Sequence, residues 1–176
     1  MKYIMVVIYL IALVPVAIAG EAEWRTFTST AGGFSVLMLR IPTFTATTDH
    51  TVVGAIIENL YTLNSSEASY SVEYSDLPGV ATFFYSDDSL YDDAKEGLLK
   101  RTGGKLISYY GIEQAGIKGK EIHCEIPASG KQPSRKEIAR FLLKDKRLYV
   151  LNITIPAGKD DQALISRYLD SFRLLK

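Results

Sequence analysis

The sequence predicts an α+β fold: an antiparallel β-sheet covered by helices on both faces, which is an α-β-α sandwich. One observation is a hairpin, in which the apolar runs Glu137–Lys144 and Arg147–Ile155 are joined by a charged turn. The second is that this hairpin is apolar on both sides, so each side needs cover. One face of its second strand carries Tyr149, Leu151, Ile153 and Ile155, and the other begins with Leu148 and Val150.

The first residues have the layout of a secretory signal peptide. Lys2 is the only charge before an apolar stretch, and Pro15 is followed by the small-residue site Ala17-Ile18-Ala19. We expect cleavage after Ala19, which makes residues 1–19 the signal peptide and residues 20–176 a single domain. The alternative is an uncleaved membrane anchor, because this apolar stretch approaches the length of a bilayer span.

The amino-acid composition favours an exported protein and argues against nucleic acid as a partner. Lys and Arg number 20 and Asp and Glu number 20, so the chain lacks the strong positive charge typical of nucleic-acid binding. The single cysteine, Cys124, cannot form an intramolecular disulfide. So few cysteines suit an exported bacterial protein, periplasmic or extracellular, better than a disulfide-rich secreted domain.

The first half of the chain predicts a series of strands. Trp24–Ser29 is a short edge-like run, and a turn at Gly32-Gly33 leads into Phe34–Ile41, which is apolar on both faces. We interpret the threonine-rich residues 43–51 as a loop. Val53–Leu63 and Ala68–Ser75 flank a polar connection typical of a hairpin.

The second half contributes helices and further strands. Ser86-Asp87-Asp88 supplies candidate N-caps for a helix that runs to about Thr102 and stops at Gly103-Gly104. Strands follow at Lys105–Ile112 and Ile117–Ile126, and then a polar loop at residues 127–136. A C-terminal helix begins near Asp160 or Asp161 and is expected to bury Leu164, Ile165, Tyr168, Leu169 and Phe172.

One strand carries residues with metal-ligating or nucleophilic side chains. His123 and Cys124 are neighbours, but adjacent strand residues point to opposite faces, so they cannot act as base and nucleophile. Cys124 shares its face with Ile122 and Ile126 and is expected to be buried. The opposite face carries Glu121, His123 and Glu125, which are weak candidates for a metal site. The simpler interpretation is a partly covered strand face with Lys118, Lys120 or Arg140 as ion partners, so we predict no metal and no cofactor.

Partner binding is a candidate role for the polar loop, and the simpler interpretation is a loop that only keeps the surface soluble. Lys131, Arg135 and Lys136 lie on this long connection, where binding residues are often found. The sequence also gives no support for catalysis. It has no nucleophile elbow, no zinc-binding H-E-x-x-H and no phosphate loop, and it contains only two histidines. We therefore predict that the protein is not an enzyme.

In its order of motifs the chain resembles the PsbP-like superfamily, specifically its secreted bacterial members. The residues that carry the resemblance are Trp24, Phe27, Gly33-Phe34-Ser35-Val36, Ile41-Pro42, Tyr70-Ser71-Val72, Tyr74 to Pro78, Arg147-Leu148-Tyr149-Val150 and Tyr168 to Arg173. The resemblance implies an antiparallel sheet with helices on both faces. It also implies a non-catalytic role, because the best known members are extrinsic subunits that dock on photosystem II.

These observations lead to one functional hypothesis and two alternatives. The hypothesis is an exported, non-catalytic binding or accessory module whose partner is a protein or a small ligand. The first alternative is an envelope-associated structural protein retained on its N-terminal anchor. The second is an undetected hydrolase.

Overall fold

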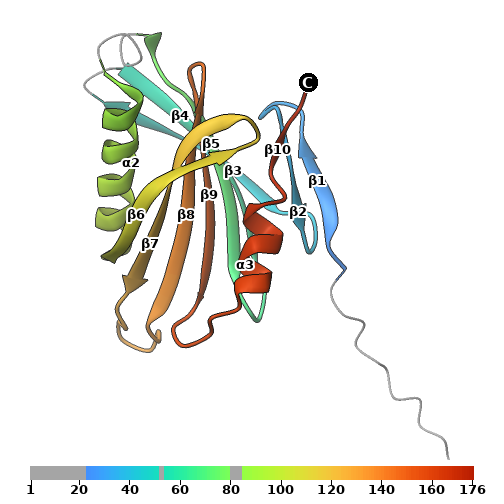
Figure 1. Cartoon of the computed structure of the whole chain (residues 1–176), viewed down its shortest axis with the longest axis vertical. Coiled ribbons are helices and arrows are strands. Elements are labelled where there is room, and N and C mark those ends of the chain that lie inside the picture. Colours follow the sequence, from blue (N-terminus) through green and yellow to red (C-terminus); the bar gives the residue numbers. More distant parts are fainter. Residues whose placement is uncertain (1–22, 52–53, 80–84) are drawn as a thin grey trace, which may run out of the picture.

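A computed structural model of the chain describes residues 23–51, 54–79 and 85–176. It contains a three-stranded sheet with the order β1-β2-β10 and a seven-stranded sheet with the order β3-β4-β5-β9-β8-β7-β6, both antiparallel (Figure 1). The predicted signal peptide lies outside the described residues. Among those that are described, no helix combines the length and apolar character needed to cross a membrane.

The elements have the following bounds. The small sheet is formed by β1 (Arg25–Ser29), β2 (Phe34–Met38) and β10 (Arg173–Leu174). The large sheet is formed by β3 (Thr43–Thr51), β4 (Gly54–Asn64), β5 (Ser69–Asp76), β6 (Lys105–Gln114), β7 (Ile117–Ile126), β8 (Arg135–Lys144) and β9 (Arg147–Pro156). The described helices are α2 (Asp87–Thr102) and α3 (Gln162–Leu169).

The predicted α-β-α sandwich is wrong, because strands dominate the described chain and the helices are short. The seven-stranded sheet does bury both faces of its centre, as the two-sided hairpin requires. One face packs against α2, and the other packs against both the three-stranded sheet and α3 (Figure 1). The error arose because apolar residues on both faces of a strand require cover without specifying whether a helix or a second sheet provides it.

Local signals placed α2 correctly. The side chain of Ser86 accepts a hydrogen bond from the backbone N–H of Ser89, which caps the first turn. Gly103 ends the helix with φ 64°, a left-handed conformation that glycine adopts without the strain a side chain would add. Asp161 caps α3 in the same way, accepting from Leu164 N–H.

Several predicted boundaries were wrong. Residues 43–51 form strand β3 rather than a loop, and β8 begins at Arg135, inside the predicted 127–136 loop. Strand β2 ends at Met38 rather than Ile41. Helix α3 ends at Leu169, so Phe172 lies beyond it, although its side chain is fully buried as expected.

Two residues of the central hairpin attach the small sheet to the large one. Arg147 forms two 2.6 Å contacts with the carboxylate of Asp76 and donates to the backbone carbonyl of Ala31 at 3.0 Å. The Tyr149 hydroxyl donates to the carbonyl of Gly32 at 2.9 Å. These contacts fix the β1–β2 turn on β9. They therefore also position the opposite end of the hairpin, where β1 begins and β2 ends.

Candidate functional site

The predicted row on β7 forms a polar cluster on the side of the sheet that faces α3. Glu121 and His123 are in contact, with His123 Nε2 2.7 Å from Glu121 Oε1. Glu125 is exposed and lies opposite Lys105 and Lys136 in the strand register. In the described ranges, no three histidine, cysteine or acidic side chains group in a way that could hold a metal ion. The structure thus brings two of the three candidates together.

Three side chains surround the carboxylate of Glu121. The Tyr110 hydroxyl donates to one oxygen and lies 3.2 Å from His123 Nε2, while Arg140 Nε donates to the other oxygen at 2.6 Å. Burial raises the pKa of Glu121, but the hydrogen bonds from Tyr110, His123 and Arg140 outweigh it, so the pKa is lowered. Burial and the contact with Glu121 raise the pKa of Tyr110 to about 12. Glu121 is consequently a carboxylate held by hydrogen bonds, and it is not available to act as a general base.

Arg140 extends this cluster toward the end of α3. Its NH1 group donates to Asp170 Oδ1 at 2.6 Å and to Gln114 Oε1 at 3.1 Å, and Gln114 in turn donates to the backbone carbonyl of Leu169. Arg140 was one of the predicted ion partners, whereas Lys118 and Lys120 lie on the opposite face. We interpret the cluster as a structural connection between α3 and strands β6 to β8, next to a shallow hollow of about 330 Å³.

Cys124 lies on the other face of β7, as predicted. Its side chain is fully buried in the cluster that α2 covers, together with Ile122 and Phe141. Burial, and then the nearby Glu137, raise the pKa of its thiol to about 12.

The predicted partner-binding cations lie in different environments. Lys131 is exposed in the turn before β8. Lys136 is paired with Asp160 at 2.9 Å, and the Nε atom of Arg135 is buried. Of the three, only Lys131 remains openly available in the structure, and its role stays a prediction.

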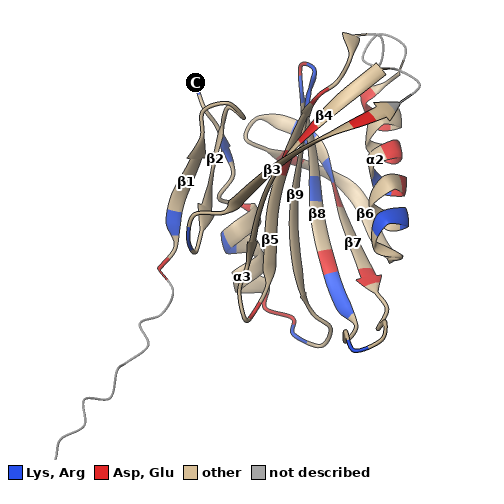
Figure 2. Cartoon of the chain, turned by 180° about the vertical axis from the view of Figure 1, so that it is seen from behind, with Lys and Arg blue, Asp and Glu red and all other residues tan. Residues whose placement is uncertain are grey.

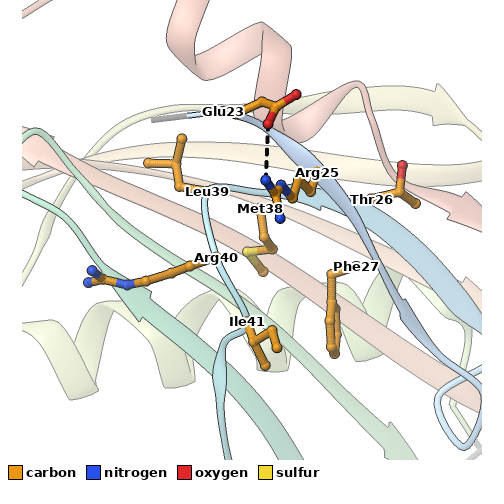
Figure 3. Close-up of a pocket in the computed structure, with 8 residues that line it drawn as sticks. All are labelled: Glu23, Arg25, Thr26, Phe27, Met38, Leu39, Arg40 and Ile41. Atoms are coloured by element: carbon orange, nitrogen blue, oxygen red, sulfur yellow. Dashed lines mark hydrogen bonds and ion pairs between the residues drawn. The ribbon is translucent and has the colours of Figure 1, made fainter. Parts of the chain in front are cut away.

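A larger hollow lies where β1 begins and β2 ends (Figure 3). It measures about 570 Å³ and is lined by Glu23, Arg25, Thr26, Phe27, Met38, Leu39, Arg40 and Ile41. Figure 3 shows Met38, Phe27 and Ile41 gathered together, with the Glu23–Arg25 ion pair to one side and Arg40 extending away. Its floor is therefore apolar and two arginines stand at its rim.

An exposed apolar residue marks this hollow. Ile41 is 87% exposed, the most exposed of the large apolar side chains in the described part of the chain. The surface continues to Phe44, which is 50% exposed and contacts Tyr61 with ring centroids 4.9 Å apart. Tyr61 also contacts Phe27 at 5.0 Å. An aromatic and aliphatic surface thus runs from the hollow onto β3.

Sequence reasoning missed this site because it placed Ile41 in a strand covered on both faces. The available signal was Arg40-Ile41-Pro42, in which a proline ends the strand and a charged residue precedes the isoleucine. An apolar side chain at such a strand end has no sheet neighbour to cover it.

Comparisons with known proteins place the fold. No protein-family model and no curated protein matches the chain. The solution structure of cyanobacterial PsbP from Synechocystis sp. PCC 6803 matches with a TM-score of 0.58 and 14% sequence identity, over 92% of this chain and 98% of that chain. The PsbP-like fold is therefore confirmed, although its expected description as an α-β-α sandwich was wrong.

A second solved structure, a Pseudomonas aeruginosa protein of unknown function, matches at a TM-score of 0.42 and 10% identity, over 77% of this chain and 85% of that chain. Similarity at that level does not establish a common fold.

Proposed function

We propose that this PsbP-like chain is an exported, non-catalytic accessory module that binds a protein partner at the hollow between Arg25, Arg40 and Ile41. The observation that carries the proposal is an 87% exposed isoleucine beside an apolar floor. Buried apolar anchors surrounded by polar groups are the usual centre of a protein interface. The partner binds by placing an apolar side chain against Ile41 and Phe27.

The charges at the rim indicate what surrounds that apolar side chain. Arg25 is paired with Glu23 at 3.1 Å, but both side chains are more than three-quarters exposed, so the pair contributes little and can exchange. Arg40 donates to the backbone carbonyl of Asn64, which leaves its charge without a carboxylate partner among the described contacts. Carboxylates on the partner would complement both arginines.

The fold supports an accessory role rather than chemistry. The solved cyanobacterial PsbP is similar in fold, and the resemblance to its superfamily implies extrinsic, non-catalytic members. A hydrolase would place its acid and base at Glu121 and His123, the one close carboxylate–imidazole pair found in the described chain. Glu121 already accepts hydrogen bonds from Tyr110 and Arg140, so it is poorly suited to accept a substrate proton.

Export and release from the membrane are part of the proposal. They rest on the signal-peptide layout of residues 1–19, with retention on an uncleaved anchor as the rival. The N-terminal residue of the protein isolated from its native envelope distinguishes cleavage after Ala19 from retention on an uncleaved anchor.

The experiment compares immobilised wild-type protein with Ile41→Ser and Arg40→Glu in capturing proteins from the native envelope fraction. Ile107→Ser is the matched control, because Ile107 is 59% exposed on the distant strand β6. We expect a partner that wild type and Ile107→Ser retain and that Ile41→Ser binds at least about tenfold more weakly, a loss of about 1.4 kcal/mol. Equal retention by Ile41→Ser would contradict the proposed site.

A further inference from the structure

Strand β3 is an open edge of the large sheet. Among the described residues it pairs only with β4, and the side chains of residues 43–50 are exposed. Open edges of this length can accept a further strand, so natural proteins usually protect them with lysine, proline or a bulge. The opposite edge, β6, has such protection, since it begins with Lys105 and is interrupted by a bulge between Leu106 and Ser108.

The edge of β3 has none of these features. Its register with β4 is continuous over nine pairs, from Thr43–Thr62 to Thr51–Gly54. It contains no lysine, arginine or proline, and Asp49 is its only acidic residue (Figure 2). A regular, unprotected edge with a single acidic residue is suited to pairing.

We propose that two copies of this chain pair through β3, antiparallel to each other, about a twofold axis at Thr47. This inference goes beyond the proposed partner hollow and does not depend on it. A twofold dimer is the commonest closed assembly of soluble proteins, and it requires a surface that is complementary to itself.

The sequence of β3 meets this requirement. Pairing about Thr47 places Phe44 opposite His50 of the second copy, and Thr45 opposite Asp49 of the second copy. Like charges directly opposite each other would be destabilising, and this register contains none. The same pairing keeps Ala46 opposite Thr48, so each face of one strand meets the same face of the other.

The apolar residues also line up. Phe44 and Ala46 share one face of the sheet with Ile57, which β4 places opposite Thr48 and which is 54% exposed. In the dimer these positions from both copies lie on the same side of the sheet, alternating with Thr48 and His50. A strand from an unrelated protein would have to match this alternation, whereas a second copy does so by symmetry.

The test introduces a cysteine at the axis. In Thr47→Cys the two copies place their Cα atoms directly opposite, at about 4.5 to 5.5 Å, which is within the range of a disulfide. The natural Cys124 is fully buried and gives little background. Under mild oxidation we expect Thr47→Cys to run as a covalent dimer on a non-reducing gel.

Thr43→Cys is the matched control on the same strand. Pairing about Thr47 separates the two residues 43 by eight residues along the strands, about 26 Å, so no disulfide can form. Equal cross-linking at 43 and 47 would reveal nonspecific collision and overturn the proposed register.

The unmodified protein provides a second measurement. We expect its molar mass by light scattering to fall from dimer to monomer on dilution, and Thr47→Lys to be monomeric throughout because it places two cations at the axis. Circular dichroism of Thr47→Lys checks that the variant is folded. A wild-type protein that stays monomeric at every concentration, or a Thr47→Cys variant that cross-links only to a different protein, would overturn the proposal.

Discussion

Phe172 stacks on Phe34, with ring centroids 5.6 Å apart and ring planes inclined by 26°. Phe172 follows α3 near the end of the chain, and Phe34 begins β2, so this contact joins the two ends of the described sequence. Tyr149 of the central hairpin completes the group, 5.3 Å from Phe172. The main core therefore depends on residues from three distant parts of the chain.

Phe172→Ala should be strongly destabilising. All three rings contribute to one buried cluster, and removing a fully buried phenylalanine costs about 3 to 5 kcal/mol. Phe44→Ala is the matched control, because half of that side chain is already in water, and it should cost under about 1 kcal/mol. Urea titration measures both variants. If Phe172→Ala unfolded at the wild-type midpoint, the packing described for this core would be incorrect.

Local features of the sequence predicted local structure well. Ser86 and Gly103 begin and end α2, and the alternation of Tyr149, Leu151 and Ile153 gave the buried face of β9. The predictions that failed concern contacts between residues that are far apart in the sequence. The threonines of β3 form a strand because β4 pairs with them, and Arg140 meets Asp170 only after the chain has folded.

The candidate site illustrates the same limit. The pairing of Glu121 with His123 follows from their spacing on one strand, but the exposure of Ile41 depends on where the small sheet ends relative to its neighbours. No periodic pattern in the sequence carries that information.

Cys124 should be unreactive in the folded protein. Its thiol is fully buried and its pKa is raised to about 12, so almost no thiolate exists near neutral pH. A bulky thiol reagent should label native wild type only at the rate of unfolding, and should promptly label Lys131→Cys, whose position is exposed in the turn before β8. Rapid labelling of native wild type would show that the face assigned to β7 is wrong.

Glu121 and Glu137 should affect stability with opposite dependence on pH. The pKa of Glu121 is lowered in the fold, so its contribution is present above the unfolded pKa of about 4.3 and is lost as pH falls through the folded pKa. Burial raises the pKa of Glu137 despite Arg101 and Arg135, so its ionisation opposes folding as pH rises.

Substitution by glutamine separates the two carboxyl groups. At pH 7, Glu121→Gln should cost about 1.5 to 3 kcal/mol, because it removes the charged hydrogen bond to Arg140 while Arg140 keeps its contact with Asp170, and the difference from wild type should shrink in acid. Glu137→Gln should instead be more stable than wild type at neutral pH. Urea midpoints across a pH series measure both effects, and a loss of stability in Glu137→Gln at neutral pH would contradict the assignment.

The mature protein should begin at Gly20. This expectation follows from Pro15 and Ala17-Ile18-Ala19, which suit an exported chain cut after Ala19. Intact-mass measurement of the protein from its native envelope decides it. Recovery of the full 176-residue chain in membranes would favour the anchored alternative.

A photo-crosslinking amino acid placed at position 41 in cells tests whether a partner protein binds at the hollow beside Ile41. The same amino acid at position 107 is the control, because Ile107 is also exposed but lies on β6. We expect a discrete covalent adduct with another protein from position 41 and none from position 107. No adduct at 41, or the same adduct at both positions, would contradict it.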